Sequence, residues 1–226
     1  MKKQIMNFLT ATLLSLSLFS AAVFSQSNGN TQKDASSTIA DLQGRWAIAN
    51  YELKDKKQYK AFEQLIADAE TATREYANEA GIWVWSGIIK STFAGVKGGL
   101  GALKYAKAAK VDLDQSISID GSVLQGSAYT SLGTLYYQVP GWPIGFGDDE
   151  KAEELLEQAI AINPDGIDSN YFYAQYLLGE KQFSKAKQHL LTAQKAAPRP
   201  QRPLADLGRQ AEIAALLAEA QKNLAL

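Results

Sequence analysis

Two segments of the chain, AEELLEQAIAINP at residues 152–164 and AKQHLLTAQKAAP at residues 186–198, repeat one pattern at an interval of 34 residues. Alanine, leucine and alanine at the first, fifth and eighth positions share one helix face, where the small alanines let a second helix approach closely. The proline five residues later ends the helix. The shared positions are Ala152 and Ala186, Leu156 and Leu190, Ala159 and Ala193, and Pro164 and Pro198.

The segment YTSLGTLY at residues 129–136 precedes the first of these patterns and has helical spacing of its own. A glycine inside a helix costs about 1 kcal/mol relative to alanine, so Gly133 indicates a close helix crossing. In the next unit the corresponding positions hold a partly different set of residues: Asn170, Tyr173, Ala174 and Leu177.

An aromatic-x2-Leu-Gly-x2-Tyr helix followed by an Ala-x3-Leu-x2-Ala-x4-Pro helix resembles the tetratricopeptide-repeat (TPR) signature over residues 126–198. The resemblance implies an all-α, right-handed superhelix of helix pairs, whose first helices line a concave groove for a peptide or protein segment. We therefore expect a TPR-like α-solenoid of about four helix pairs. Residues 203–224 should form the capping helix that such a solenoid needs.

The earlier units match the signature less well, and whether the first helix pair is a true repeat stays open. In the second unit the matching residues are Trp83, Gly87, Ala109, Leu113, Ser116 and Gly121. In the first unit only four residues match, Trp46, Tyr59, Ala61 and Leu65.

Three regions are predicted: a signal peptide at residues 1–25, a flexible linker at 26–37 and the solenoid domain at 38–226. Lys2 and Lys3 precede a short apolar stretch that is interrupted by serines, which favours cleavage before Gln26 over an uncleaved membrane anchor. The chain contains no cysteine that could carry a lipid. The mature protein is therefore expected to be periplasmic or secreted, with no stable membrane insertion after cleavage.

Composition narrows the possible chemistry. The chain has no cysteine, which excludes thiol catalysis and cysteine-based metal sites. It has one histidine, His189. Lys and Arg total 23 and Asp and Glu total 24, a balance that gives no electrostatic case for nucleic acid. We predict no catalytic residue, no metal site and no cofactor. An enzyme could use only a Ser-Lys or paired-carboxylate arrangement, and the sequence shows no signature of either.

The first candidate binding residues lie on the groove that the TPR resemblance implies. In the best-matched units this face is uncharged and partly aromatic. The residues are Thr130, Thr134, Tyr137, Tyr171, Gln175 and Leu178. Arg199 and Arg202, beside the capping helix, could bind an anionic ligand, or they could pair with acids such as Asp206 and Glu212.

A second candidate is the segment VPGWPIGFGD at residues 139–148, which adds residues between the two helices of a repeat. Its prolines and glycines exclude a regular helix. In one interpretation the loop presents three residues to a ligand: Pro140, Trp142 and Phe146. In the other, the aromatic side chains fold back and fill the end of the helix pair.

The sequence therefore predicts a non-enzymatic periplasmic protein that acts as a scaffold or adaptor for protein partners. The alternative is an accessory component of a solute transporter. The Gly-Trp-Pro loop, followed by helix pairs after a signal peptide, distantly resembles the TPR component associated with tripartite ATP-independent periplasmic transporters. That resemblance implies a periplasmic solute-binding protein as the partner, with a small ligand handled in the groove or in a pore between subunits.

Overall fold

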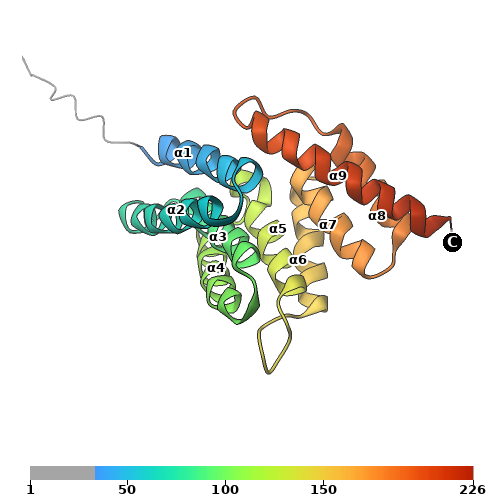
Figure 1. The fold of residues 1–226 in the computed structure, drawn as a ribbon, viewed down its shortest axis with the longest axis horizontal. Coiled ribbons are helices and arrows are strands. Elements are labelled where there is room, and N and C mark those ends of the chain that lie inside the picture. The colour runs from blue at the N-terminus through green and yellow to red at the C-terminus, as the bar shows by residue number, and fades with distance from the viewer. Residues whose placement is uncertain (1–33, 226) are drawn as a thin grey trace, which may run out of the picture. The chain divides into compact units, whose positions relative to one another are not determined.

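A computed structural model describes residues 34–225, which form nine α-helices, one short π-helix (η1) and no strand within that range (Figure 1). The predicted all-α class is confirmed. The elements are α1 (Ala35–Ala47), η1 (Ile48–Glu52), α2 (Asp55–Glu75), α3 (Ala80–Lys97), α4 (Gly99–Asp120), α5 (Val123–Gln138), α6 (Asp149–Ile162), α7 (Ile167–Gly179), α8 (Phe183–Lys195) and α9 (Pro203–Leu224).

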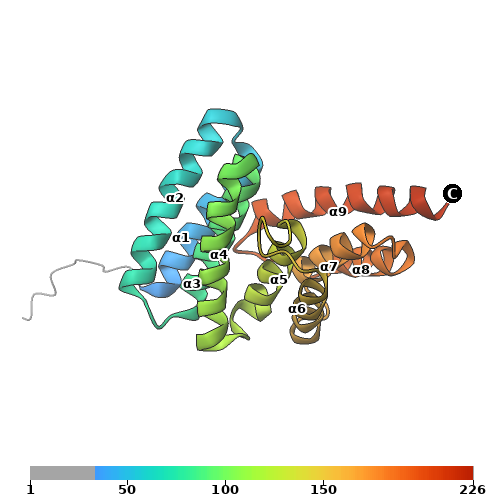
Figure 2. The same ribbon diagram turned by 90° about the horizontal axis from the view of Figure 1, so that it is seen from below.

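Successive helices pack in pairs, as a TPR-like solenoid requires. α3 packs on α4, α5 on α6, and α7 on α8, while α1 with η1 packs on α2 to form the first pair. α9 packs along α8 and runs out past it in the second view (Figure 2). The prediction of four helix pairs and a capping helix is confirmed.

The repeated alanines and leucines make the crossings that their spacing predicts. Ala152, Leu156 and Ala159 on α6 are fully buried, as are the corresponding Ala186, Leu190 and Ala193 on α8. A Cβ atom on Gly133 would lie 2.8 Å from Leu156 Cγ and 3.1 Å from the Ala152 carbonyl oxygen. Gly87 is equally confined, because a Cβ atom there would lie 2.6 Å from Leu113 Cγ. These glycines let α5 and α3 approach α6 and α4 closely.

The first pair has a different core from the one its sequence matches suggested. Trp46 and Leu65 are buried as expected, whereas Tyr59 and Ala61 are only half-buried. The buried face of α2 consists of Phe62, Leu65, Ile66, Ala69, Ala72 and Thr73. In the second pair the fully enclosed tryptophan is Trp85, while Trp83 is half-buried and donates to the Ala77 carbonyl oxygen. Large side chains replace the small residues of the signature in the first pair, so the match there holds only in part. In the second pair the matched Ala109, Leu113 and Ser116 are fully buried, as the signature predicts.

The predicted linker at residues 26–37 extends too far into the folded region. α1 begins at Ala35, because the Asp34 side chain accepts a hydrogen bond from the Ser37 backbone N–H at 2.7 Å and caps the helix. The predicted signal peptide and the linker up to residue 33 lie outside the described residues. No helix within residues 34–225 is both long and apolar enough to cross a lipid bilayer.

Candidate functional site

The inner surface of the solenoid forms a groove with a cavity volume of about 1180 Å³. Residues of α1, α3 and α5, the start of α7 and the segment from Thr192 into α9 line it. This is the arrangement that the TPR resemblance implies, with the first helix of each pair on the concave side. The apolar part of the wall consists mainly of Ile39, Trp46, Trp85, Ile88, Leu124 and Phe172.

α9 does more than cover the last pair, because its first turns also contact the start of the solenoid. Ala205 belongs to the core cluster of the first helices. Gly208 lies against the Tyr51 ring of η1, where a Cβ atom would be 2.3 Å from a ring carbon. Burial at this contact raises the pKa of Tyr51 to about 12. α9 therefore closes one side of the groove.

Two arginines of this closing segment are held by partly buried ion pairs. Arg199 pairs with Asp168 and with Asp206, both at 2.6 Å, and the buried Arg209 pairs with Asp168 at 2.9 Å and with Glu212. Burial by itself would raise the pKa of Asp168, but Arg209 and Arg199 outweigh it and hold that pKa well below its usual range. Arg199 and Arg209 therefore join α9 to α7.

Arg202 is in a different situation, although the sequence placed it with Arg199. Within residues 34–225 it makes no ion pair, and its Nε atom is buried without a hydrogen-bond acceptor. Its guanidinium lies 5.0 Å from the centre of the Trp85 ring, and Trp85 Nε1 is also buried without an acceptor. Burial first, and then the nearby Arg199, lower the pKa of Arg202. Both side chains line the groove.

Of the residues predicted for the groove face, Thr130 and Thr134 line the cavity. Thr134 Oγ1 donates to the Thr130 carbonyl oxygen at 2.8 Å. The structure does not place Tyr137, Tyr171, Gln175 or Leu178 in the cavity wall.

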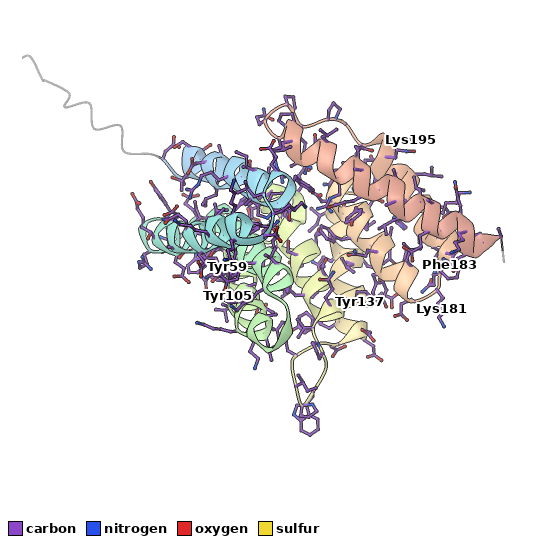
Figure 3. All side chains as sticks on the ribbon, in the orientation of Figure 1. Tyr59, Tyr105, Tyr137, Lys181, Phe183 and Lys195 are labelled. Carbon is purple, nitrogen blue, oxygen red and sulfur yellow. The ribbon has the colours of Figure 1, made fainter. Side chains whose placement is uncertain are left out.

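Packing against neighbouring helices explains where the other four residues lie. Tyr171 is buried beneath the Arg209 guanidinium, 4.1 Å away, because α9 covers this face of α7. Tyr137, near the end of α5 (Figure 3), packs edge-on against Tyr176 at 5.2 Å. Gln175 Oε1 accepts a hydrogen bond from Gln138 Nε2 at 3.4 Å, and Leu178 belongs to the core.

The loop at residues 139–148 projects from the ends of α5 and α6 (Figure 1). Gly147 N–H donates to the Pro140 carbonyl oxygen and Asp148 N–H donates to the Tyr136 carbonyl oxygen, both at 3.0 Å, which ties the base of the loop together. Phe146 folds back and packs edge-on against Tyr136 at 5.4 Å. Trp142 is 90% exposed. The packing interpretation therefore holds for Phe146, and ligand binding by Trp142 stays a prediction.

The polar side chains that could suggest catalysis are engaged in hydrogen bonds and ion pairs within the fold. Ser86 Oγ donates to Asp112 at 2.6 Å and Lys90 Nζ pairs with the same carboxylate at 2.7 Å. All three side chains are buried between α3 and α4, so this serine and lysine have no path to a substrate. His189 is half-buried, with Nδ1 2.8 Å from Asn170 Oδ1. In the part of the chain that the structure describes, no group of three or more acidic or histidine side chains could hold a metal ion.

Comparison with known proteins agrees with this architecture. The family model described as tetratricopeptide repeat matches residues 144–220. That segment is therefore similar in sequence to TPR repeats. A thermophilic TPR protein of Thermus thermophilus, TTC0263, superimposes with a TM-score of 0.53 at 14% identity, covering 82% of this chain and 100% of that one. The TPR-like fold therefore extends beyond the segment that the family model matches.

A second solved structure, that of MamA protein, has a TM-score of 0.44 at 17% identity and covers 84% of this chain and 88% of that one. No curated protein matches the sequence.

Proposed function

We propose that the protein is an exported, non-enzymatic scaffold or adaptor that binds an extended segment of a partner protein in its concave groove. The observation that carries the proposal is the groove itself, which runs along the first helices of all four pairs and is closed on one side by α9. TPR domains generally bind proteins or peptides, and TPR proteins are generally non-enzymatic scaffolds. The predicted signal peptide supports a periplasmic location.

The chemistry of the groove wall favours a largely apolar segment over a strongly acidic one. Tryptophan, isoleucine and leucine side chains offer apolar contact, and the same wall also contains uncharged hydrogen-bonding groups. An extended peptide exposes both kinds of surface, since its side chains alternate with backbone N–H and C=O groups. The uncharged polar groups of the wall include Gln43, Ser91, Thr92, Ser131, Thr134 and Gln138.

The loop at residues 139–148 supplies a second contact with the same partner. Trp142 is 90% exposed and Ile144 is 63% exposed, although both are large apolar side chains. An exposed tryptophan on a loop whose base is tied by two hydrogen bonds is the kind of residue that anchors protein interfaces.

A pull-down from an envelope extract of the source organism tests the proposal. Thr134→Arg places a long charged side chain in the groove, and Thr71→Arg makes the same change at an exposed site of α2 outside it. We expect the wild-type protein and Thr71→Arg to retain the same partner and Thr134→Arg to lose it. Equal retention by all three folded proteins would rule out the groove as the binding site.

A second function, as an accessory component of a periplasmic solute transporter, is favoured by the closure of the groove into a cavity. Small-molecule sites have volumes on the order of 300–1,000 Å³, and this cavity, at about 1180 Å³, could admit a small ligand. In that case the partner retained in the pull-down is a solute-binding protein. Recovery of an assembly or cell-wall protein would favour the scaffold.

A further inference from the structure

Two hydrogen-bond donors with no acceptor meet at the inner wall of the groove. Trp85 is only 2% exposed, yet its Nε1 donor is unsatisfied, and so is the buried Nε donor of Arg202. Buried donors without acceptors destabilise a fold, so native proteins seldom retain them unless a water molecule or a ligand completes the bonding. The two side chains touch, because the guanidinium lies 5.0 Å from the centre of the indole ring.

The acids near Arg202 are already engaged by other arginines. Asp168 accepts from both Arg199 and Arg209, Asp206 accepts from the Arg199 side chain and backbone, and Glu212 accepts from Arg209. Arg202 therefore lies beside an ion-pair network without joining it. Its Nε donor is buried without an acceptor, and such a donor is costly.

The surroundings of Arg202 indicate which kind of ligand group could accept hydrogen bonds from its guanidinium. A guanidinium presents planar donors that match the two oxygens of a carboxylate. The wall beside it is apolar and aromatic: Trp85 packs edge-on against Trp46 at 5.7 Å, and Trp46 Nε1 is already satisfied by Thr92 Oγ1. The site therefore suits one carboxylate on an otherwise apolar body.

We propose that Arg202 binds a carboxylate of the ligand that occupies the groove, with Trp85 beside it as the aromatic floor of the site. The proposal deepens the proposed function and rests on it, because it assigns an anchoring group to the segment that the groove binds. The carboxylate can belong to a peptide or to a small organic acid, and the binding chemistry is the same.

Titration of the protein, purified from cells that express the full chain, with two pairs of probes tests this proposal. One pair is N-acetyl-Gly-Ala-Ile-Phe with a free carboxylate and the same peptide as its amide; the other is hexanoate and hexanamide. The readouts are Kd and the NMR resonance of the Trp85 indole N–H, which Trp85→Phe identifies. We expect at least one acid to bind at least tenfold more tightly than its amide, with a preference that falls as salt rises, and to shift the indole resonance.

The acid that binds distinguishes the two sources of the carboxylate. Arg202→Gln should abolish the preference for the acid, Arg202→Lys should keep part of it, and Arg74→Gln, at an exposed site of α2, should leave it unchanged. Circular dichroism checks that each variant is folded. The lysine variant keeps the test decisive if Arg202→Gln fails to fold.

Three outcomes would overturn the carboxylate site: equal binding of acid and amide, an unchanged preference in folded Arg202→Gln, or no binding of either acid. The last would leave a bridging water as the partner of the two donors. Equal binding of the two peptide forms would leave the proposed groove function intact. The pull-down with Thr134→Arg judges that function independently.

Discussion

At the scale of single residues, the loop at residues 139–148 shows how two similar side chains can differ in role. Phe146 packs against Tyr136, and Trp142 is 90% exposed. Trp142→Ala should leave the melting temperature nearly unchanged, since little buried surface is lost, and should weaken partner binding by about 2 kcal/mol or more. A thermal melt and a binding titration measure the two effects.

Phe146→Ala provides the opposite case within the same loop. It should lower the free energy of unfolding by about 2 kcal/mol, because it removes a half-buried aromatic side chain. A large loss of stability in Trp142→Ala, with normal affinity in the folded fraction, would contradict a recognition role for Trp142.

His189 should make stability depend on pH near neutrality. Burial lowers the pKa of His189 below the value of about 6.5 expected in the unfolded chain, so the folded state favours the neutral ring. The unfolded chain then binds the proton more readily, and stability should be full above about pH 6.5 and fall as the pH drops toward the folded-state pKa. His189 is the only histidine in the chain, so no other histidine contributes to the pH dependence of stability.

Urea unfolding of the wild type and His189→Gln between about pH 8 and pH 5 measures this effect. Glutamine cannot titrate and can still donate a hydrogen bond to Asn170. The variant should lose less stability than the wild type over this interval. Parallel curves for the two proteins would show that the histidine is not responsible.

At the scale of helices, substitution by alanine should change the stability in opposite directions at two glycines, although both lie inside a helix. A Cβ atom on Gly87 of α3 would lie 2.6 Å from Leu113 Cγ, whereas one on Gly44 of α1 meets nothing within 4 Å. Gly44→Ala should stabilise the fold by about 0.5–1 kcal/mol through helix propensity. Gly87→Ala should destabilise it by about 1–3 kcal/mol, because the crossing of α3 and α4 must open.

Denaturant unfolding of the two variants beside the wild type measures the difference. If both substitutions stabilised the protein, close helix crossing could not be the reason for glycine at position 87.

The helices that the sequence predicted best are those whose packing is set by local spacing. Alanine, leucine and alanine with a following proline define the second helices of the last two pairs, and the fully buried Ala159 and Ala193 bear this out. The first pair is predicted less well, because large residues such as Phe62 and Ile66 form part of its core and no short pattern identifies them. The predicted linker boundary lies too late in the chain, because Asp34 caps α1 and the helix begins at Ala35.

At the scale of the whole molecule, the main feature that the sequence did not predict is the closure of the groove by α9. The capping helix was expected from residues 203–224, but its contact with η1 joins Gly208 to Tyr51, two residues far apart in the chain. The same closure buries Tyr171 beneath Arg209 and separates Arg202 from the ion pairs of Arg199. Spacing within a repeat carries no information about such long-range contacts, so only part of the candidate site followed from the sequence.

Site-specific photocrosslinking tests most directly whether the groove receives the partner. A benzophenone side chain is placed at Gln138 or Gln201, two exposed residues at the groove, and at Gln115, an exposed residue of α4 outside it. Irradiation in the envelope extract should link the same partner protein to positions 138 and 201 and leave position 115 unlinked. A partner that crosslinks from position 115 but from neither groove position would contradict the proposed binding mode.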